Sequence, residues 1–188
     1  FLRPSTRASY RAHLEKYLNP AIGGISLERL SVTDVERLTH NLSSKGLAAA
    51  TVQRILATLR SAMAHAVRTG LIDKNPTTGV RVPSQVVRPI HIWTPDEAAT
   101  FLDRLTDDAL GVLLRLALVT GMRRGELLGL RWSHVSLTGG FLFVQVSRLS
   151  IGGVTVEGPP KSRAGTRTVF VDPATVNALR QLQLASRP

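Results

Sequence analysis

Hydrophobic residues recur with helical spacing through the first seventy residues of the chain. The pattern is clearest from about residue 49 to residue 69, where apolar side chains keep to one face and Gly70 follows at a position typical of a helix C-terminus. That face is formed by Val52, Ile55, Leu56, Leu59, Met63, Ala66 and Val67. The pattern therefore predicts a long helix that packs on one side and displays polar residues on the other.

Two shorter helices are expected before it. The first covers about residues 5–18 and is predicted to end at Asn19-Pro20, because proline lacks the amide that continues a helix. The second is predicted to begin with a capping box of Thr33 and Glu36 and to stop before Gly46. Together the three segments predict a small helical bundle.

Prolines and valines from 77 to 89 interrupt the helical pattern and predict an extended linker. Thr94, followed by Pro95 and two acidic residues, then begins a new helix. The core face of that helix would be Phe101, Leu102 and Leu105. We therefore expect two domains, residues 1–83 and residues 84–188.

An apolar run from Leu110 to Val119 predicts a buried helix that stops at Gly121. A second, short helix begins near Arg124. Its predicted anchors in the core are Leu127, Leu128 and Leu130. The two helices would meet at a rigid corner.

Further along, β-rich runs that begin at Phe141, Val154 and Arg167 are separated by turn residues and predict a three-stranded antiparallel sheet. The basic stretch 159–167 would form a hairpin between the last two strands, and Asp172 would open a final helix. The expected fold class is mainly α with a small antiparallel sheet (α+β).

The chain carries 24 lysines and arginines against 13 acidic residues, a formal net charge of +11. Residues 1–83 hold 12 basic and 5 acidic side chains, and residues 84–188 hold 12 and 8, so the first domain is the more positive. This excess favours a polyanionic partner. There is no cysteine and the five histidines lack ligand spacing, so neither a disulfide framework nor a metal site is expected. No apolar run approaches the ~20 residues that cross a bilayer, so no membrane partner is expected.

Arg123 and Glu126 fall at the corner between the two helices of the second domain. A guanidinium carries a permanent charge and a fork of donors that matches two phosphate oxygens. Glu126, three residues on, is close enough on a helix to steer it. Taken alone, such a pair is more typical of a surface ion pair worth about 0–1 kcal/mol.

The stretch around this pair, residues 120–135, reads TGMRRGELLGLRWSHV. It resembles the first arginine motif of the tyrosine recombinases, the phage integrase family, which has the pattern T-G-x-R-x-x-E-L-x-x-L-x-W followed by a short polar turn. The resemblance implies that Arg123 contacts the scissile phosphate and that Glu126 supports the active site. Arg124 occupies a variable position of the motif and is not expected to be catalytic.

The long helix of the first domain supports the same family. Residues 47–61 are similar to the L-x-x-x-T-V-x-R-x-L-x-x-L-R-S pattern of its core-binding domain, and residues 70–76 are similar to the G-x-I-x-x-N-P turn that follows. The implied architecture is a helical core-binding domain followed by the N-terminal part of a mixed α/β catalytic domain. The residues expected to contact DNA are Thr51, Gln53, Arg54, Arg7, Lys45, Arg148, Arg163 and Arg167. For the long helix, a solvated polar face is the alternative.

Lys161 lies in the basic stretch 159–167. In the family, a lysine in the pattern K-[TS]-x-x-[GS]-x-R on this hairpin is catalytic, and Lys161 is the match. An ammonium at a hairpin tip can donate a proton to the leaving 5′ oxygen as a general acid. Considered alone, a hairpin lysine is more often a solvated charge. Arg167, at the end of the pattern, is also a candidate for a structural ion pair.

Tyr10 and Tyr17 are the only tyrosines of the sequence, and both fall on the first predicted helix. A complete family member carries, beyond the catalytic lysine, an H-x-x-R element and the tyrosine that attacks the phosphate. His65 and Arg68 have the H-x-x-R spacing but precede the arginine motif, so we interpret them as polar neighbours on a helix face. The chain is therefore expected to be a fragment that lacks the nucleophile and is inactive alone.

The resemblance implies a site-specific recombinase or integrase of a phage or mobile element, which cleaves and rejoins DNA through a 3′-phosphotyrosyl intermediate without a cofactor. Its expected partner is double-stranded DNA at a recombination site. The full-length protein is expected to form a homo-tetramer there, in the cytoplasm of a bacterial cell or phage-infected host. The alternative is a non-cleaving, sequence-specific DNA-binding relative that occupies recombination sites. An unrelated basic helical nucleic-acid-binding protein would need all three motifs to coincide by chance.

Overall fold

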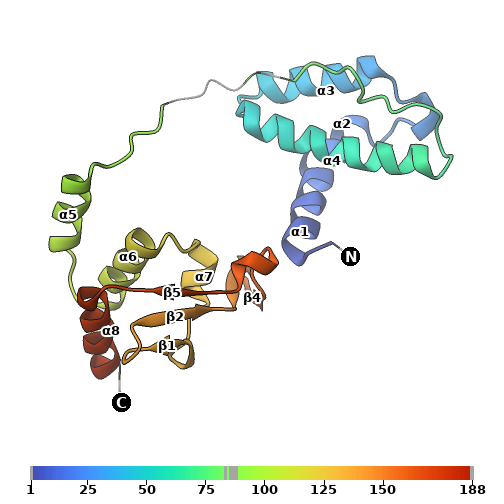
Figure 1. Ribbon diagram of the computed structural model, residues 1–188. Coiled ribbons are helices and arrows are strands. Elements are labelled where there is room, and N and C mark those ends of the chain that lie inside the picture. Colours follow the sequence, from blue (N-terminus) through green and yellow to red (C-terminus); the bar gives the residue numbers. More distant parts are fainter. Residues whose placement is uncertain (1, 83, 85–88, 187–188) are drawn as a thin grey trace. The chain divides into compact units, whose positions relative to one another are not determined.

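The computed structural model describes residues 2–82, 84 and 89–186 and divides into two compact units, Phe1–Pro89 and Ile90–Pro188 (Figure 1). We refer to them as unit 1 and unit 2. The division falls at the C-terminal end of the predicted linker, of which residues 83 and 85–88 lie outside the described part of the chain. Each unit has a hydrophobic core of its own.

Unit 1 is helical throughout its elements. These are α1 (Pro4–His13), the π-helical turn η1 (Leu14–Leu18), α2 (Asn19–Ile22), the 3-10 turn η2 (Leu27–Arg29), α3 (Val32–Ser44) and α4 (Ala49–Arg68). The predicted long helix is confirmed by α4, because all of its predicted apolar positions except Val67 are buried. Gly70 follows with a φ of 70°, which only glycine adopts without strain.

The first helical segment does not end at Asn19-Pro20, so this prediction is wrong. The helix α1 passes through η1 into α2, and the chain stays helical to Ile22. In a regular α-helix a proline ring clashes with the carbonyl four residues earlier, and the wider π-helical turn before Pro20 relieves that clash. Pro20 then lies in the first turn of α2, where a missing amide is tolerated.

The N-terminal cap of α3 is Ser31 rather than Thr33. The Ser31 hydroxyl accepts a hydrogen bond from the Asp34 amide at 3.3 Å, and the Asp34 carboxylate accepts one from the Ser31 amide at 3.1 Å. The sequence thus contains two pairs with capping-box spacing, Ser31 with Asp34 and Thr33 with Glu36. The first pair forms the capping box. The chain leaves η2 extended at Leu30 and Ser31, which sets where α3 begins.

The first part of the predicted linker is packed against unit 1 rather than extended. Pro76 and Thr77 are buried, and Val80 belongs to the hydrophobic core. The side-chain carbonyl of Asn75 holds this turn, because it accepts from the Thr77 amide at 2.9 Å and from the Thr77 hydroxyl at 2.7 Å. The proline and the polar residues therefore shape a closed turn here, which local composition does not distinguish from a linker.

Unit 2 combines helices and short strands. Its elements are α5 (Pro95–Asp103), α6 (Ala109–Thr120), α7 (Arg124–Leu128), the 3-10 turn η3 (Trp132–His134), β1 (Val135–Ser136), β2 (Phe141–Val144), β3 (Ser147–Ile151), β4 (Val154–Gly158), the 3-10 turn η4 (Arg163–Gly165), β5 (Arg167–Phe170) and α8 (Pro173–Ala185). The predicted start of α5 is confirmed, since the Thr94 hydroxyl accepts from the Glu97 amide at 3.3 Å. The expected fold class, mainly α with small antiparallel pairing, is confirmed as well.

The strands form two sheets instead of the single three-stranded sheet that was expected. The strand β2 lies between β1 and β5, whereas β4 pairs with β3 in a separate hairpin (Figure 1). Gly152 and Gly153, with φ of 57° and 81°, form the two-residue turn of that hairpin. Such a turn pairs a strand with the one directly before it, which places β4 against β3, while β5 pairs with β2 instead. The stretch 159–167 therefore connects two sheets and is not a hairpin.

The helix α6 ends at Gly121 as predicted, with a φ of 60° there. It is buried on one side only. Val112 and Leu116 lie in the core of unit 2, whereas other apolar residues of α6 face outward. The exposed ones are Leu110, Leu114, Leu118 and Val119. No helix among the described residues combines the length and the apolar character needed to cross a bilayer.

The helix α7 contributes Leu127 to the same core. Leu130, just beyond the helix, packs against that core while partly buried. Leu128 is 45% exposed, so its prediction as a core anchor is wrong. A helix of five residues turns only part of its surface inward, and the inward part holds Glu126 and Leu127.

Candidate functional site

Arg123 lies at the corner between α6 and α7. Gly121 ends the first helix, and Arg123 is the cap residue from which the second begins. The Arg123 amide donates to Glu126 Oε2 at 3.1 Å, and Arg123 Nη1 donates to Glu126 Oε1 at 2.9 Å. The Arg123 side chain is nevertheless 66% exposed. The corner thus presents a guanidinium to solvent, while one carboxylate accepts a hydrogen bond from the Arg123 backbone amide and another from one nitrogen of that guanidinium.

Glu126 is the buried member of the pair, with 2% of its surface exposed. Besides the two bonds from Arg123, its Oε2 accepts a hydrogen bond from Arg167 Nη2 at 3.0 Å. Burial on its own raises the pKa of Glu126, but the hydrogen bonds from Arg167 and Arg123 outweigh it and hold this pKa below its ordinary value. Glu126 is therefore an anion at neutral pH despite its burial.

The helix α7 lies very close to β3 because glycines flank the contact. A Cβ on Gly129 would lie 2.7 Å from the Val146 carbonyl oxygen, and one on Gly125 would lie 2.5 Å from Ser147 Oγ. Side chains at these two positions would push the helix away from the strand. Neither glycine is among the residues selected from sequence, although a glycine inside a helical pattern is a signal of close packing.

Lys161 lies on the connection between β4 and β5. It follows the buried Pro160, and the connection turns back so closely at η4 that a Cβ on Gly165 would lie 2.5 Å from Pro160 Cβ. Arg167 Nη1 donates to the Gly165 carbonyl at 3.1 Å. Lys161 therefore belongs to a compact turn whose far end is bonded to Arg167. The side chain of Arg163, in the same turn, lies outside the described part of the chain.

Arg148, selected from sequence as a DNA contact, is bonded to Glu157 within the β3–β4 hairpin. Its Nε and Nη2 donate to Glu157 Oε1 at 2.9 Å and 2.6 Å. Arg131, just before η3, bonds the other oxygen of the same carboxylate. The hydrogen bond from Arg148, followed by that from Arg131, lowers the pKa of Glu157. This cluster joins the hairpin to the segment that follows α7, and Glu157 and Arg131 are missing from the sequence-based selection.

Five of the predicted DNA contacts belong to unit 1. Thr51, Gln53 and Arg54 lie on the first two turns of α4, where Thr51 and Gln53 are half-buried and Arg54 is exposed. Arg7 is exposed on α1, and Lys45 is exposed directly after the last residue of α3. The structure therefore gathers three of the five at the start of one helix.

A polar contact joins α1 to α4. His13 Nδ1 and Thr58 Oγ1 are 2.7 Å apart, and the Thr58 hydroxyl donates in turn to the Arg54 carbonyl at 3.2 Å. Burial, together with the nearby charge of Arg54, lowers the pKa of His13, so this imidazole is neutral at pH 7. The contact ties the helix that carries Arg7 to the one that carries Arg54.

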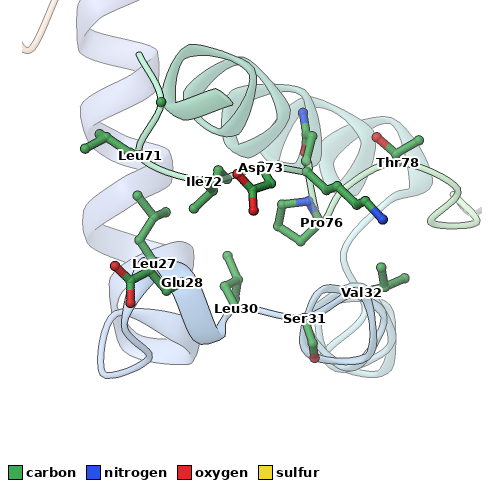
Figure 2. Close-up of a pocket in the computed structure, with 13 residues that line it drawn as sticks. Leu27, Glu28, Leu30, Ser31, Val32, Leu71, Ile72, Asp73, Pro76 and Thr78 are labelled. Atoms are coloured by element: carbon green, nitrogen blue, oxygen red, sulfur yellow. The ribbon is translucent and has the colours of Figure 1, made fainter. Parts of the chain in front are cut away.

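Unit 1 also contains a groove of about 1080 Å³, between η2, the start of α3 and the segment 70–78. Figure 2 shows Leu27 and Leu30 on one side of it and Ile72 and Pro76 on the other. Its charged lining residues are Glu28, Asp73 and Lys74. The groove contains none of the predicted DNA contacts among its described lining residues, so it is separate from the basic positions of α1 and α4.

The arrangement in unit 2 suits the binding of a phosphate group. An exposed guanidinium fixed at its base can offer its remaining donors to two oxygens of an anion. An ammonium such as that of Lys161 can donate a proton to a leaving oxygen. Among the described residues, no group of three or more His, Cys, Asp or Glu side chains is arranged to hold a metal ion.

Sequence comparisons connect the chain to recombinases. Residues 2–70 match the family described as phage integrase, N-terminal SAM-like domain. A tyrosine recombinase XerC of Xylella fastidiosa (strain 9a5c) is 38% identical over 124 residues, which cover 64% of this chain and 41% of that protein. A tyrosine recombinase XerC-like protein of Caldanaerobacter subterraneus subsp. tengcongensis is 25% identical over 195 residues, which cover 95% of this chain and 50% of that protein. The chain thus spans half or less of the length of these curated relatives.

Solved structures share the fold. The integrase of the Tn1549 transposon, in complex with a circular intermediate DNA, gives a TM-score of 0.84 at 19% identity over 100% of this chain and 61% of that one. A lambda integrase dimer bound to a core site gives 0.65 at 22% identity over 96% of this chain and 49% of that one. Because the sequence identities are only 19% and 22%, these comparisons show a shared fold alone.

Proposed function

Since this chain belongs to the tyrosine recombinase, or phage integrase, family, we propose that the protein containing it carries out site-specific DNA recombination. In the proposed reaction a tyrosine oxygen attacks a backbone phosphorus, forms a 3′-phosphotyrosyl bond and releases the 5′ oxygen of the neighbouring nucleotide. A 5′ hydroxyl from a second strand then reverses the step. Strands are exchanged without any net change in the number of phosphodiester bonds.

The proposal assigns three roles in unit 2. Arg123 neutralises charge on the non-bridging oxygens of the scissile phosphate, and a second arginine beyond these residues shares that task. Glu126 holds Arg123 in position by accepting hydrogen bonds from its amide and its guanidinium. Lys161 gives a proton to the 5′ oxygen as the bond to phosphorus breaks, so that an alcohol leaves instead of an alkoxide.

The observation that carries the proposal is the difference in burial within the Arg123–Glu126 pair. In an ordinary surface ion pair both partners are solvated and their attraction is weak. Here the carboxylate is 2% exposed and the guanidinium 66% exposed. A buried anion that fixes an exposed cation at a helix corner is what the recognition of a phosphate requires, because the cation is held in place before its ligand arrives.

The nucleophile is proposed to be a residue other than Tyr10 or Tyr17. Both lie in unit 1, Tyr10 on α1 and Tyr17 on η1, where it packs against the core of that unit. Arg123 and Lys161 belong to unit 2. In the family the attacking tyrosine follows the catalytic lysine in sequence, whereas both tyrosines here precede Lys161. We therefore expect these 188 residues by themselves to bind a duplex without cutting it.

Duplex DNA at a recombination site is the proposed partner, and the basic residues of unit 1 on α1 and α4 are the proposed contacts. Lys45, Arg148 and Arg163 remain proposed as further positions near the DNA backbone, whereas Arg167 has both terminal nitrogens bonded within unit 2 and is not proposed as a DNA contact. One of the solved relatives is a lambda integrase tetramer bound to a Holliday junction. By analogy we propose a homo-tetramer on paired sites for the full-length protein, acting in the cytoplasm of a bacterial cell or phage-infected host.

The test substitutes Arg123→Ala in the full-length protein and traps the covalent protein–DNA adduct on a nicked duplex. We expect adduct formation to fall by about 10²- to 10³-fold, the loss typical of removing one charge-stabilising donor, while duplex affinity is largely retained. Arg124→Ala is the matched control, because it removes the same charge from the next residue, which is also exposed. Equal adduct yields from the two variants would rule out the role of Arg123.

A second candidate function is a DNA-binding relative that occupies recombination sites without cleaving them. The observation that favours it is the net charge of +11, because an excess of basic residues suits binding to duplex DNA and by itself provides no nucleophile. The adduct assay separates the two candidates. Tight, sequence-specific binding by the full-length protein with no adduct at any time would support the non-cleaving function, whereas mass spectrometry of an adduct would identify the attacking tyrosine.

A further inference from the structure

We propose that Arg167 is a positioning residue for the reaction, holding Glu126 and thereby Arg123 while it also fixes the turn that carries Lys161. The inference rests on the proposed function. It assigns to Arg167 a role other than that of a contact to the DNA backbone. Its basis is that the two terminal nitrogens of this side chain bond two different parts of unit 2.

The first bond leads to Arg123. Arg167 Nη2 donates to Glu126 Oε2 at 3.0 Å, and the other oxygen of that carboxylate accepts from Arg123 Nη1 at 2.9 Å. Glu126 is thus placed between two arginines that are 44 positions apart in the chain. Because the carboxylate is buried, water cannot replace a hydrogen bond that it loses. A displacement of Glu126 would therefore also displace the Arg123 side chain bonded to it.

The charges of Arg123, Glu126 and Arg167 give a second reason to assign this role to Arg167. Arg123 and Glu126 alone would cancel, and a phosphate approaching them would meet a neutral pair. With Arg167 bonded to the same carboxylate, the three side chains carry a net charge of +1. Arg167 is 30% exposed and Arg123 is 66% exposed, so the excess positive charge is most accessible at Arg123.

The second bond leads to Lys161. Arg167 Nη1 donates to the Gly165 carbonyl at 3.1 Å, and Gly165 packs against Pro160, the residue directly before Lys161. Arg167 itself is fixed at the start of β5, where it pairs with the buried Val144 of β2. The turn is therefore anchored to the sheet through one side chain, which limits how far Lys161 can move.

The test uses the full-length protein with Arg167→Gln, Arg167→Lys and a matched control, Arg180→Gln. Arg180 is an exposed arginine of α8 in the same unit, bonded to Asn177 at 3.2 Å. Two duplexes are compared, one ordinary and one with sulfur in place of the bridging 5′ oxygen at the scissile phosphate. A thiolate leaves without a proton, so the second duplex reports cleavage that no longer needs a general acid.

On the ordinary duplex we expect Arg167→Gln to lower the rate of adduct formation by saturating protein about 10- to 100-fold, as for a small misplacement of reacting groups. Duplex affinity should stay close to that of the unchanged protein and of Arg180→Gln. On the sulfur-containing duplex, the rate of adduct formation should recover fully for a Lys161→Ala variant but only in part for Arg167→Gln. A better leaving group replaces the general acid, but it does not correct the position of Arg123. Arg167→Lys keeps the positive charge but not the forked donors of the guanidinium. Its rate of adduct formation should therefore lie between those of the unchanged protein and Arg167→Gln.

Two results would overturn the inference. A loss confined to DNA affinity, with an unchanged rate once the DNA is bound, would make Arg167 a backbone contact. Full recovery of Arg167→Gln by sulfur would show that it acts only through Lys161 and would remove the link to Arg123. If Arg167→Gln fails to fold, Arg167→Lys is used instead, both to compare DNA affinity with the rate of adduct formation and to compare the two duplexes. Absence of any adduct from the unchanged protein would instead overturn the proposed function.

Discussion

Glu126 shows at the scale of one residue how the site combines stability with chemistry. A buried carboxylate is unfavourable unless hydrogen bonds replace its hydration, and Glu126 has three of them, two from Arg123 and one from Arg167. The bonds that keep it charged are the ones that orient Arg123. Its contribution to folding should therefore depend on pH.

The pKa of Glu126 is lower in the folded protein than its ordinary value of 4.5. A group of this kind adds stability above its unfolded pKa and loses it as the pH falls through the folded value. We expect Glu126→Gln to lower the free energy of unfolding by about 1–3 kcal/mol at pH 7, and the deficit to shrink below about pH 4.5. Fluorescence of Trp93 and Trp132, the only tryptophans, follows the unfolding of unit 2.

Glu36→Gln, at an exposed position of α3 in unit 1, serves as the control for removing one negative charge. It should leave the transition followed by the tryptophans unchanged. A deficit for Glu126→Gln that stays constant from pH 7 to pH 3 would contradict the view that Glu126 is ionised in the folded protein.

At the scale of elements, the site depends on how α7 is docked on the β3–β4 hairpin. Two features fix it, the close approach of Gly125 and Gly129 to β3 and the Glu157 cluster that includes Arg131 and Arg148. Both glycines are buried and Gly129 approaches backbone atoms of Val146, whereas the cluster is partly solvated. We therefore expect the glycines to matter more for stability than the cluster.

Gly129→Ala tests this docking. A Cβ there would lie 2.7 Å from the Val146 carbonyl oxygen and 2.9 Å from its carbon, and backbone atoms cannot rotate away as a side chain can. We expect a loss of about 1–3 kcal/mol in the free energy of unfolding of unit 2, in the range of overpacked interiors. Gly158→Ala on β4 is the matched control, because a Cβ at Gly158 meets nothing within 4 Å. Similar stabilities of the two variants in urea denaturation would argue against a tight contact between α7 and β3.

For the whole molecule, the dominant property is its net charge of +11. The excess is larger in the first half of the chain, where α1 and α4 present exposed arginines. Binding of a polyanion by such a surface releases counterions, so affinity should fall as salt rises. The slope of that dependence counts the phosphate contacts.

We expect the affinity of the 188-residue chain for duplex DNA to fall steeply with salt, and Arg54→Ala to reduce the slope of log K against log salt by about 1 if Arg54 contacts one phosphate. Fluorescence anisotropy with a labelled duplex, titrated across a series of salt concentrations, measures both quantities. Arg37→Ala is the control, since Arg37 is an exposed arginine of the same unit paired with Asp34 on α3. An equal change of slope for both variants would mean that Arg54 contributes only general charge.

Part of the candidate site is contained in short stretches of sequence. The Arg123–Glu126 pair follows from a three-residue spacing at a helix start, and Lys161 from a motif of seven residues. The partner of Arg167 does not follow from any local pattern, because Glu126 is 41 positions away. The bond from Arg148 to Glu157 spans only nine positions, but it depends on the β3–β4 hairpin, whose first strand, Ser147–Ile151, was not expected from sequence.

By itself, the sequence determined the helices α4, α5 and α6, the glycine that ends α6, the fold class and the family. These features depend on periodicity, capping and motifs within a few neighbouring residues, where the preference of each residue acts directly. Only the tertiary structure decided the pairing of β2 with β5, the packing of Thr77 and Val80, and the burial of Glu126 between two arginines. Each of these depends on contacts between distant segments, which form because the whole core packs and not because of any local preference.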